Sequence, residues 1–467
     1  MTNIVIIGGG PAGYEPALVA EGLGAHVTLI DRDVAGGACV LYDCVPSKTF
    51  IASSEVMTNA RNAQLRGVAV EGDSKVVIDV PVLHKHVKDL AAAQSADIKA
   101  ALEKSGVNLV HGSARLGGAG DRGRHKVEIS PEHGDSWTEH ADVVLMATGA
   151  SPRIVPGAEP DGERILTWRD VYDLPKLPDH LIVIGSGVTG AEFASAYNEM
   201  GVEVTLISSR DRVLPHEDGD AAQLIEDVFT RRGMKVMNNG RASTVVNTGD
   251  GVRVDLEDGR VVEGSHCLMT VGSVPNTKGL GLAESGVETD KGGFVSVDRV
   301  SRTNVPGIYA AGDCTGLLML ASVAAMQGRI AMAHALGEAV QPLKLKTVSS
   351  NIFTHPEIAT VGIGERTIVD KAMDVRSVML PLGTGPRAKM AGLTDGFVKL
   401  FCRPQTGAVI GGVIVAPYAS ELILPITMAV QNNLTVSQIA STLAIYPSFT
   451  GSITEAARQL VAHDDLS

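Results

Sequence analysis

The stretch NIVIIGGGPAG, residues 3–13, decides the fold. Its first part, residues 3–7, is a short apolar run typical of a buried parallel strand. Three glycines follow in GxGxxG spacing: Gly8, Gly10 and Gly13. Such glycines let backbone N–H groups and the N-terminus of the next helix approach a pyrophosphate. The stretch therefore predicts a dinucleotide-binding loop.

The residues that follow supply the context that this loop needs. We expect a helix through about Gly22 and a second strand, HVTLI, that ends at Asp31. An acid at that point can accept a hydrogen bond from a ribose hydroxyl. A GxGxxG pattern alone is a weak signal, but here it has its strand, its helix and its terminal acid.

The same pattern occurs a second time. A strand LIVIG leads into a second set of glycines, Gly185, Gly187 and Gly190, and a helix and the strand EVTLI come next. The chain is therefore predicted to contain two nucleotide-binding folds. Ser208 and Arg210 stand where an acid would favour NADH, and they favour NADPH because an arginine suits a 2′-phosphate. The alternative is that this arginine belongs to a solvated loop.

A cysteine pair lies in GGACVLYDCVPSKT, residues 36–49. In a straight helix, Cα atoms five residues apart are roughly 8.6 Å from each other, whereas a disulfide tolerates at most about 7 Å. Cys39 and Cys44 can therefore pair only if the helix is interrupted. Pro46 favours this because it has no N–H for the carbonyl of Tyr42. Two unrelated buried cysteines are the alternative.

Composition limits the function further. The chain has 467 residues, enough for two to four domains, and a net charge of −13 that argues against nucleic acid or an anionic membrane as a partner. Five cysteines give no disulfide framework, so we expect a reducing cytoplasm. The start of the chain lacks a secretory signal pattern. The apolar segment 408–430 contains Glu421 and two prolines, which favours a buried strand and helix over a membrane span.

Several further elements are predicted by pattern. Residues 50–66 and 84–104 are expected to be helical, residues 115–140 to form a small antiparallel sheet, and residues 142–146 to form a buried strand. The tail from about residue 346 has its own strand and helix pattern and is expected to be an interface domain.

Six motifs carry a family resemblance: both GxGxxG loops, the cysteine segment, ATG at 147–149, GD at 312–313 and FTHPEIATVG at 353–362. With them the whole chain resembles the flavoprotein disulfide reductases, the class I pyridine nucleotide-disulfide oxidoreductases that include dihydrolipoamide dehydrogenase, glutathione reductase and mercuric reductase. The resemblance implies an α/β fold with two Rossmann-like domains and a C-terminal α+β dimerisation domain. It implies an FAD-binding domain at 1–149 and 273–345, an NAD(P)H-binding domain at 150–272 and a dimerisation domain at 346–467.

The resemblance also implies the cofactor contacts. FAD would contact Gly8, Gly10, Pro11, Ala12, Gly13, Asp31, Gly37, Ala38, Lys48, Thr148, Gly149, Gly312, Asp313, Leu320 and Ala321. NADPH, or NADH in its place, would contact Gly185, Gly187, Val188, Thr189, Gly190, Glu192, Ser208, Arg210 and Gly272. No metal site is predicted.

In this family electrons pass from the nicotinamide to the flavin and on to the cysteine pair. By the resemblance, Cys44 is the thiol nearer the flavin and Cys39 exchanges with substrate, which requires a low thiol pKa. Lys48 would lie near the flavin N5, paired with Glu192. The alternative is that Lys48 and Glu192 are ordinary surface charges.

The sequence departs from the family in its tail. Disulfide-reducing members carry a His-Pro-x-x-x-Glu motif, and the matching segment here is YPSFTG, residues 446–451. Tyr446 replaces the histidine and Gly451 the glutamate. A phenol with a pKa near ~10 is a poor base at neutral pH, whereas imidazole near ~6.5 is suited to the task.

The departure resembles a lipoamide-dehydrogenase-like subgroup that acts as NAD(P)H:quinone reductases. We therefore expect a cytoplasmic homodimer that passes hydride to FAD and on to a quinone-type acceptor, with Cys39, Cys44, Lys48, Glu192 and Tyr446 at the catalytic site. Lipoamide or another disulfide is the alternative acceptor. A flavoprotein that senses NAD(P)H and binds a partner is the remaining alternative.

Overall fold

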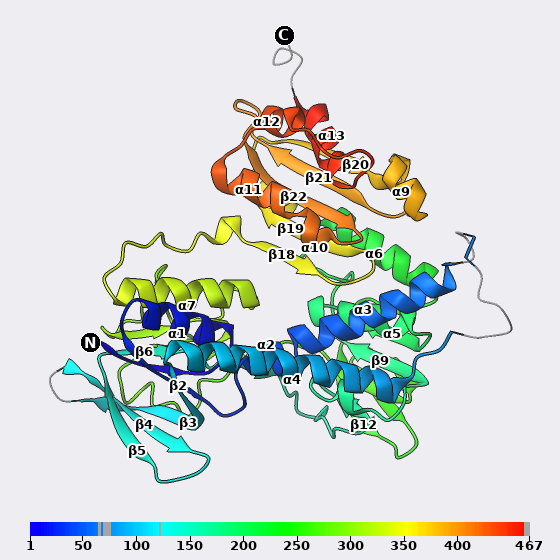
Figure 1. Cartoon of the computed structure of the whole chain (residues 1–467). Helices are drawn as coiled ribbons and strands as arrows, with labels where there is room; N and C mark the ends of the chain where they lie inside the picture. Colours follow the sequence, from blue (N-terminus) through cyan, green and yellow to red (C-terminus); the bar gives the residue numbers. More distant parts are fainter. Residues whose placement is uncertain (64–66, 69–75, 121–122, 462–467) are drawn as a thin grey trace.

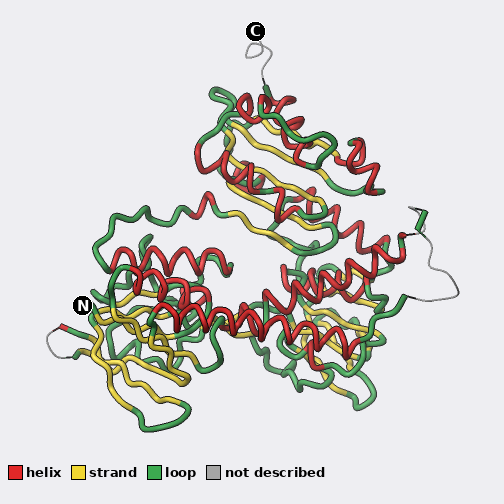
Figure 2. The backbone as a smooth tube through the Cα atoms, in the orientation of Figure 1, coloured by secondary structure: helices red, strands yellow, loops and turns green. Residues whose placement is uncertain are grey.

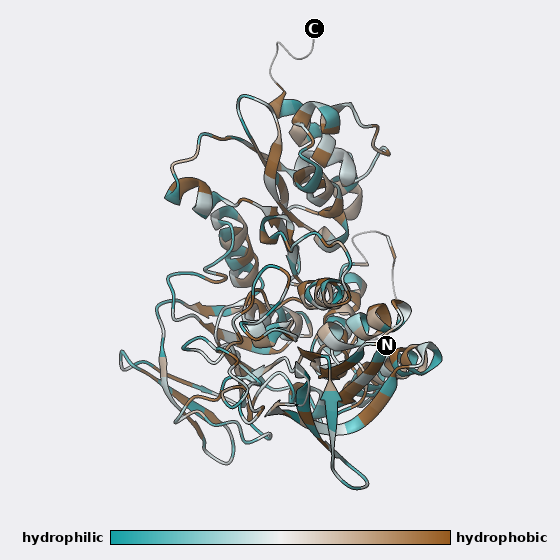
Figure 3. Cartoon of the chain, turned by 90° about the vertical axis from the view of Figure 1, so that its left-hand side faces the viewer, coloured by the Kyte–Doolittle hydropathy of each residue, from teal (hydrophilic) through white to brown (hydrophobic). Residues whose placement is uncertain are grey.

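The computed structural model describes residues 1–63, 67–68, 76–120 and 123–461. The chain forms three bodies, each built on its own large sheet (Figures 1 and 2). The α/β class with two Rossmann-type sheets and a C-terminal antiparallel sheet is confirmed. In Figure 3 the apolar residues gather on the strands, and the outer loops are mostly hydrophilic.

The first body contains a seven-stranded sheet in the order β17-β6-β1-β2-β3-β4-β5. Its strands are β1 (Asn3–Ile7), β2 (His26–Asp31), β3 (Asn108–Ala119), β4 (His125–Pro131), β5 (Trp137–Ala141), β6 (Val143–Met146) and β17 (Ile308–Ala310). Its helices are α1 (Pro11–Gly22), α2 (Gly37–Leu41), α3 (Cys44–Arg61), α4 (Val80–Ser105) and α7 (Ala321–Ala335), with a short helix η4 (Asp313–Thr315).

The second body is built on a five-stranded parallel sheet in the order β11-β10-β9-β15-β8. Its elements are β8 (Ile165–Leu166), η3 (Val171–Asp173), β9 (His180–Ile184), α5 (Val188–Glu199), β10 (Glu203–Ile207), α6 (Gly219–Arg231), β11 (Lys235–Met237), β12 (Ala242–Asn247), β13 (Val252–Leu256), β14 (Val261–Gly264) and β15 (His266–Met269). The strands β7 (Ala150–Pro152) and β16 (Ser273–Pro275) pair with each other where the chain enters and leaves this body.

The third body is an antiparallel sheet in the order β18-β19-β22-β21-β20 with helices packed on it. Its strands are β18 (Ser349–Ile352), β19 (Glu357–Gly362), β20 (Arg376–Pro381), β21 (Phe397–Cys402) and β22 (Val409–Ala416). Its helices are α8 (Glu365–Asp370), α9 (Pro386–Ala391), α10 (Ala419–Leu422), α11 (Leu424–Asn432), α12 (Val436–Ser441) and α13 (Thr450–Leu460), with η5 (Leu345–Thr347) and η6 (Leu382–Thr384).

The local predictions hold with changed boundaries. The helix predicted at 84–104 begins at Val80, because the Asp79 side chain caps its first turn by accepting from the N–H of Val82. The helix predicted at 50–66 is the later part of α3, and residues 64–66 lie outside the described part of the chain. The segment 408–430 forms the buried strand β22 and the helix α11, as expected.

Helices α3 and α4 position the site described below. The N-terminal end of α3 packs against α2 in the first body, and its middle packs against α5 of the second body. Helix α4 runs beside α3 and crosses from the first body to the second (Figure 1). Within the described residues, no helix is both long and apolar enough to cross a membrane.

Candidate active site

The two glycine loops have the shape of phosphate cradles. A Cβ on Gly13 would lie 1.8 Å from the carbonyl oxygen of Gly8, and one on Gly190 would lie 1.9 Å from that of Gly185. Only glycine therefore allows each helix to approach its strand so closely. Helices α1 and α5 begin without a side-chain cap and without an acid in the first turn, so no side chain of the first turn competes with an anion at their N-terminal ends. Both loops thus fit a dinucleotide pyrophosphate.

The cysteine stretch is interrupted as the sequence predicts. Helix α2 ends at Leu41 and α3 begins at Cys44, so the break lies between the two cysteines. Pro46 occupies the first turn of α3, where its missing N–H costs nothing. Both cysteines are partly buried free thiols in this structure. A hydrogen bond from the Cys44 thiol to Cys39 is the largest influence on the pKa of each group.

That hydrogen bond separates the two thiols chemically. It lowers the pKa of Cys39, and the Lys48 ammonium lowers it further. Burial and the Asp43 carboxylate oppose this and raise the pKa, but the net shift is downward. The same hydrogen bond, together with burial, raises the pKa of Cys44. Cys39 is therefore the more acidic thiol of the pair, and it is the position to which the family resemblance assigns exchange with substrate.

An ion pair joins the stretch to the second body. The Lys48 Nζ lies 2.9 Å from Oε2 of Glu192, whose side chain is 4% exposed. The other oxygen, Oε1, accepts from the N–H of Phe353 in the third body at 2.9 Å. Burial lowers the pKa of Lys48, but Glu192, Cys44 and Asp43 together raise it above its ordinary value. Lys48 and Glu192 are therefore not surface charges, and all three bodies meet at this carboxylate.

Two further carboxyls lie near the thiols. Burial raises the pKa of Asp43, and Glu192 adds to this while Lys48 opposes it. Burial and the neighbouring Asp43 raise the pKa of Asp313 to about 6. Asp313 begins η4 just after β17, and Leu320 caps α7, whose first residue is Ala321. β1 and β17 are parallel strands of the first sheet, so the glycine loop before α1 and Asp313 both follow strand ends at the same edge of that sheet.

Asp31 and Ser208 are both occupied by internal contacts. The Asp31 carboxylate accepts from the N–H groups of Gly9 and Asp33, and burial raises its pKa. Ser208 is completely buried, and its hydroxyl donates to the Arg212 carbonyl while it accepts from Ser186. The contact of Ser208 with the nucleotide stays a prediction, and in this structure the Ser208 hydroxyl is held by hydrogen bonds within the protein. Arg210 is exposed above it.

The structure does not bring Tyr446 to the thiols of its own chain. The connection between α12 and α13 lies at the far end of the third body from α2 and α3 (Figure 1). Tyr446 is 82% exposed there, beside Leu443 at 98% and Ile445 at 80%. In a single chain this apolar loop projects into solvent.

A cleft opens beside the thiol pair. It has a volume of about 590 Å³ and is lined by Cys44, Lys48, Ala52 and Val56 of α3 and by His86 and Leu90 of α4. The four α3 residues recur every four positions and so share one face of the helix. This places a thiol, an ammonium and an imidazole around one opening.

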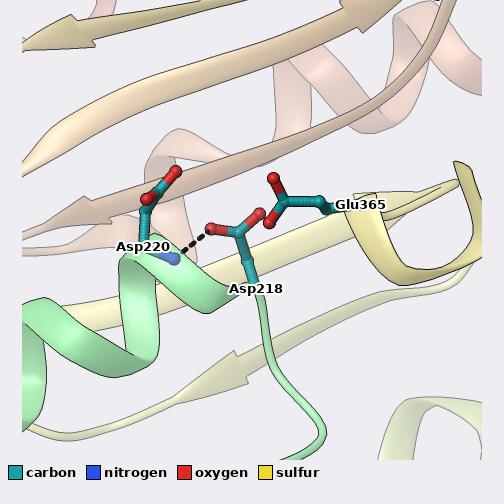
Figure 4. A group of neighbouring side chains, drawn as sticks. All are labelled: Asp218, Asp220 and Glu365. Carbon is teal, nitrogen blue, oxygen red and sulfur yellow. Dashed lines mark hydrogen bonds between the residues drawn. The ribbon is translucent and has the colours of Figure 1, made fainter. Parts of the chain in front are cut away.

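A separate acidic cluster joins the second and third bodies (Figure 4). The carboxylates of Asp218, Asp220 and Glu365 surround the Lys399 Nζ at 2.9, 2.8 and 3.5 Å. The Lys399 side chain is 7% exposed and that of Asp218 is 2% exposed. The ammonium supplies the positive charge that this cluster requires.

Comparison with protein families accounts for nearly the whole chain. Residues 2–328 match the family described as pyridine nucleotide-disulphide oxidoreductase, and residues 348–457 match its dimerisation domain. The chain belongs to the pyridine nucleotide-disulphide oxidoreductases. The family resemblance derived from the sequence is thereby confirmed, and members of this family bind a flavin and a nicotinamide nucleotide.

Two curated relatives in this family differ in activity. The NAD(P)H dehydrogenase (quinone) of Mycobacterium tuberculosis H37Rv is 58% identical over 470 residues, covering 100% of this chain and 95% of that protein. The dihydrolipoyl dehydrogenase of Chlamydia pneumoniae is 32% identical over 446 residues, covering 96% and 94%.

Solved structures of the oxidoreductase family agree with this fold. The crystal structure of LpdA from M. tuberculosis superposes with a TM-score of 0.94 at 58% identity, covering 99% of this chain and 100% of that one. The flavoprotein disulfide reductase RclA from Escherichia coli superposes with a TM-score of 0.86 at 23% identity, which supports the fold alone.

Sequence reasoning missed Asp43, His86 and Lys399. Asp43 lies inside the cysteine stretch, where its position between the two thiols was a usable signal. His86 and Leu90 are four residues apart on a helix that was predicted, so they share a face, but nothing in the sequence shows what that face meets. Lys399 is 181 positions from Asp218 and 179 from Asp220, so the sequence does not show that they meet.

Proposed function

We propose that the chain is an FAD-dependent NAD(P)H dehydrogenase that reduces a quinone. The observation that carries this proposal is the replacement of the family's histidine and glutamate by Tyr446 and Gly451. The 58% identity with a mycobacterial quinone reductase over the whole chain supports it. When bound, the flavin would accept a hydride from the nicotinamide and deliver its electrons to the acceptor.

The residues of this chain supply binding and electrostatics. The first glycine loop, Asp31, Asp313 and the start of α7 would hold FAD, within segments 1–149 and 273–345. The second loop and Arg210 would hold NADPH within 150–272. The Lys48 ammonium, fixed by Glu192, would hold positive charge beside the reacting ring. Segment 346–467, through its dimerisation domain, would join two chains into a homodimer.

A disulfide acceptor is the second candidate, because the structure brings Cys39 and Cys44 within hydrogen-bond contact and lowers the pKa of Cys39. Anaerobic NADPH oxidation by the purified holoenzyme, with a soluble naphthoquinone and with lipoamide, separates the two. We expect quinone turnover to exceed lipoamide turnover, and Cys39→Ser to retain the first while abolishing the second. Faster lipoamide turnover would overturn the proposal.

Arg210→Ala should weaken NADPH much more than NADH. A hydrogen bond to a charged group contributes about 1.5–3 kcal/mol, so we expect KM for NADPH to rise roughly 10- to 100-fold. Steady-state kinetics with both nucleotides measures this. Arg241→Ala is the matched control, since Arg241 lies on the same body and faces Glu257 at 3.6 Å. Equal losses with both nucleotides would remove the phosphate assignment.

A further inference from the structure

The cleft between α3 and α4 has two chemically different parts. Its polar lining includes Cys44, Lys48 and His86, with the hydroxyls of Thr49 and Ser53, whereas Val45, Ala52, Val56 and Leu90 are its apolar lining. Val56 and Leu90 are 67% and 41% exposed, so this apolar lining is accessible in the chain. Its volume of about 590 Å³ lies in the range of small-molecule sites, which are mostly apolar with a few placed polar groups. A flat aromatic acceptor suits these walls.

Quinone reduction sets a proton requirement for such a site. A quinone takes up two electrons and two protons to become a hydroquinone. The hydride from NAD(P)H carries both electrons and one proton, so a second proton must come from elsewhere. The family's usual proton-transfer position holds Tyr446, and a phenol, with an ordinary pKa near ~10, does not change its protonation readily near neutral pH. The site therefore needs another group that exchanges protons near neutral pH.

His86 is the imidazole that lines the cleft in the described part of the chain, and imidazole is the side chain suited to this exchange. We propose that His86 is the acid–base group of the acceptor site, supplied by the same chain as the thiol pair. This inference rests on the proposed quinone reduction. The imidazolium donates its N–H proton to the quinone oxygen as the electron pair arrives, and the neutral ring then takes a proton from water.

The surroundings leave this imidazole free to act. On α4, Lys85 pairs with Asp89 and Lys88 pairs with Asp173 of η3, each at 2.5 Å. Across the cleft on α3, the Lys48 ammonium is paired with Glu192 and Cys44 keeps its proton. Within the described residues His86 belongs to no ion pair, and the nearby ammonium groups of Lys48, Lys85 and Lys88 each have a carboxylate partner.

His86→Gln tests the proposal on the holoenzyme in two half-reactions. Reduction of the flavin by NADPH should stay within twofold of the parent rate. Reoxidation by a soluble naphthoquinone should fall by about 10²-fold or more, because general acid catalysis contributes ~10²–10⁴ in rate. Its dependence on pH between 5.5 and 8 should flatten, and added imidazole should partly restore the rate of His86→Ala. His133→Gln is the matched control, since His133 is 93% exposed on the turn between β4 and β5.

Binding provides a readout that is independent of turnover. 1-Naphthol carries the hydroxyl of a reduced quinone and cannot itself be reduced, and His86→Ala should weaken its binding about tenfold through loss of one hydrogen bond. Negligible reoxidation of the parent enzyme by quinone would overturn the proposed function itself. Fast reoxidation with an unchanged rate and pH profile in His86→Gln, together with unchanged naphthol affinity in His86→Ala, would overturn only the role of His86.

Discussion

Gly13→Ala should give a protein that folds but does not retain a flavin. The new Cβ would lie 1.8 Å from the Gly8 carbonyl oxygen, a separation that no side-chain rotation relieves. Helix α1 must therefore move away from β1, and the N–H groups at its start leave the place where a pyrophosphate would bind. We expect visible flavin absorbance to disappear after desalting, and all NADPH oxidation with it.

Gly22→Ala is the matched control for this result. Gly22 ends the same helix, and a Cβ there has no heavy atom within 4 Å. This variant should keep its flavin, since alanine is favoured over glycine in a helix by roughly 0.5–1 kcal/mol. A stoichiometric flavin in Gly13→Ala would contradict the assignment of this loop.

Lys399→Met should be strongly destabilising. Methionine fills nearly the same volume but removes the charge that balances Asp218, which is 2% exposed. Breaking a buried ion pair by removing one partner costs about 3–5 kcal/mol. We expect the free energy of unfolding in urea, measured at fixed protein concentration, to fall by this amount for the transition that includes the interface between the second and third bodies.

A second substitution separates lost charge from lost packing. Asp218→Asn neutralises the carboxylate and can still cap α6, since an amide oxygen also accepts from the N–H groups of Asp220 and Ala221. The double variant should therefore recover much of the loss. Lys176→Met, at an exposed pair with Asp179, should change stability by no more than ~0–1 kcal/mol. Equal losses of stability in Lys399→Met and Lys176→Met would refute the buried-charge explanation.

The nucleotide folds could be predicted because their signals are local. Each combines a strand, a glycine loop and a helix within about thirty residues, and steric contact at Gly13 or Gly190 forces that order. The interrupted helix at Cys39 and Cys44 was predictable for a similar reason, since the distance limit of a disulfide and the chemistry of Pro46 apply within one turn.

The remaining parts of the site depend on contacts between distant segments. The Ser208 hydroxyl is buried against Ser186, which lies 22 positions earlier in the second glycine loop. His86 lines the cleft only because α4 packs beside α3. The partners of Lys399 come from two different bodies. Periodicity and composition are properties of one segment at a time, and they do not indicate which distant segments come into contact.

The position of β17 has a consequence for synthesis on the ribosome. Strand β17 pairs with β6 in the first sheet, although residues 147–307 lie between them and include the whole second sheet. At ~5–20 residues per second, the ribosome needs on the order of ten to thirty seconds to reach β17 after completing β6. During that interval the nascent first sheet has an unpaired edge along β6, and the last strand of the second sheet, β15, is made before β17. The first body, although it begins the chain, therefore finishes folding later than the second body.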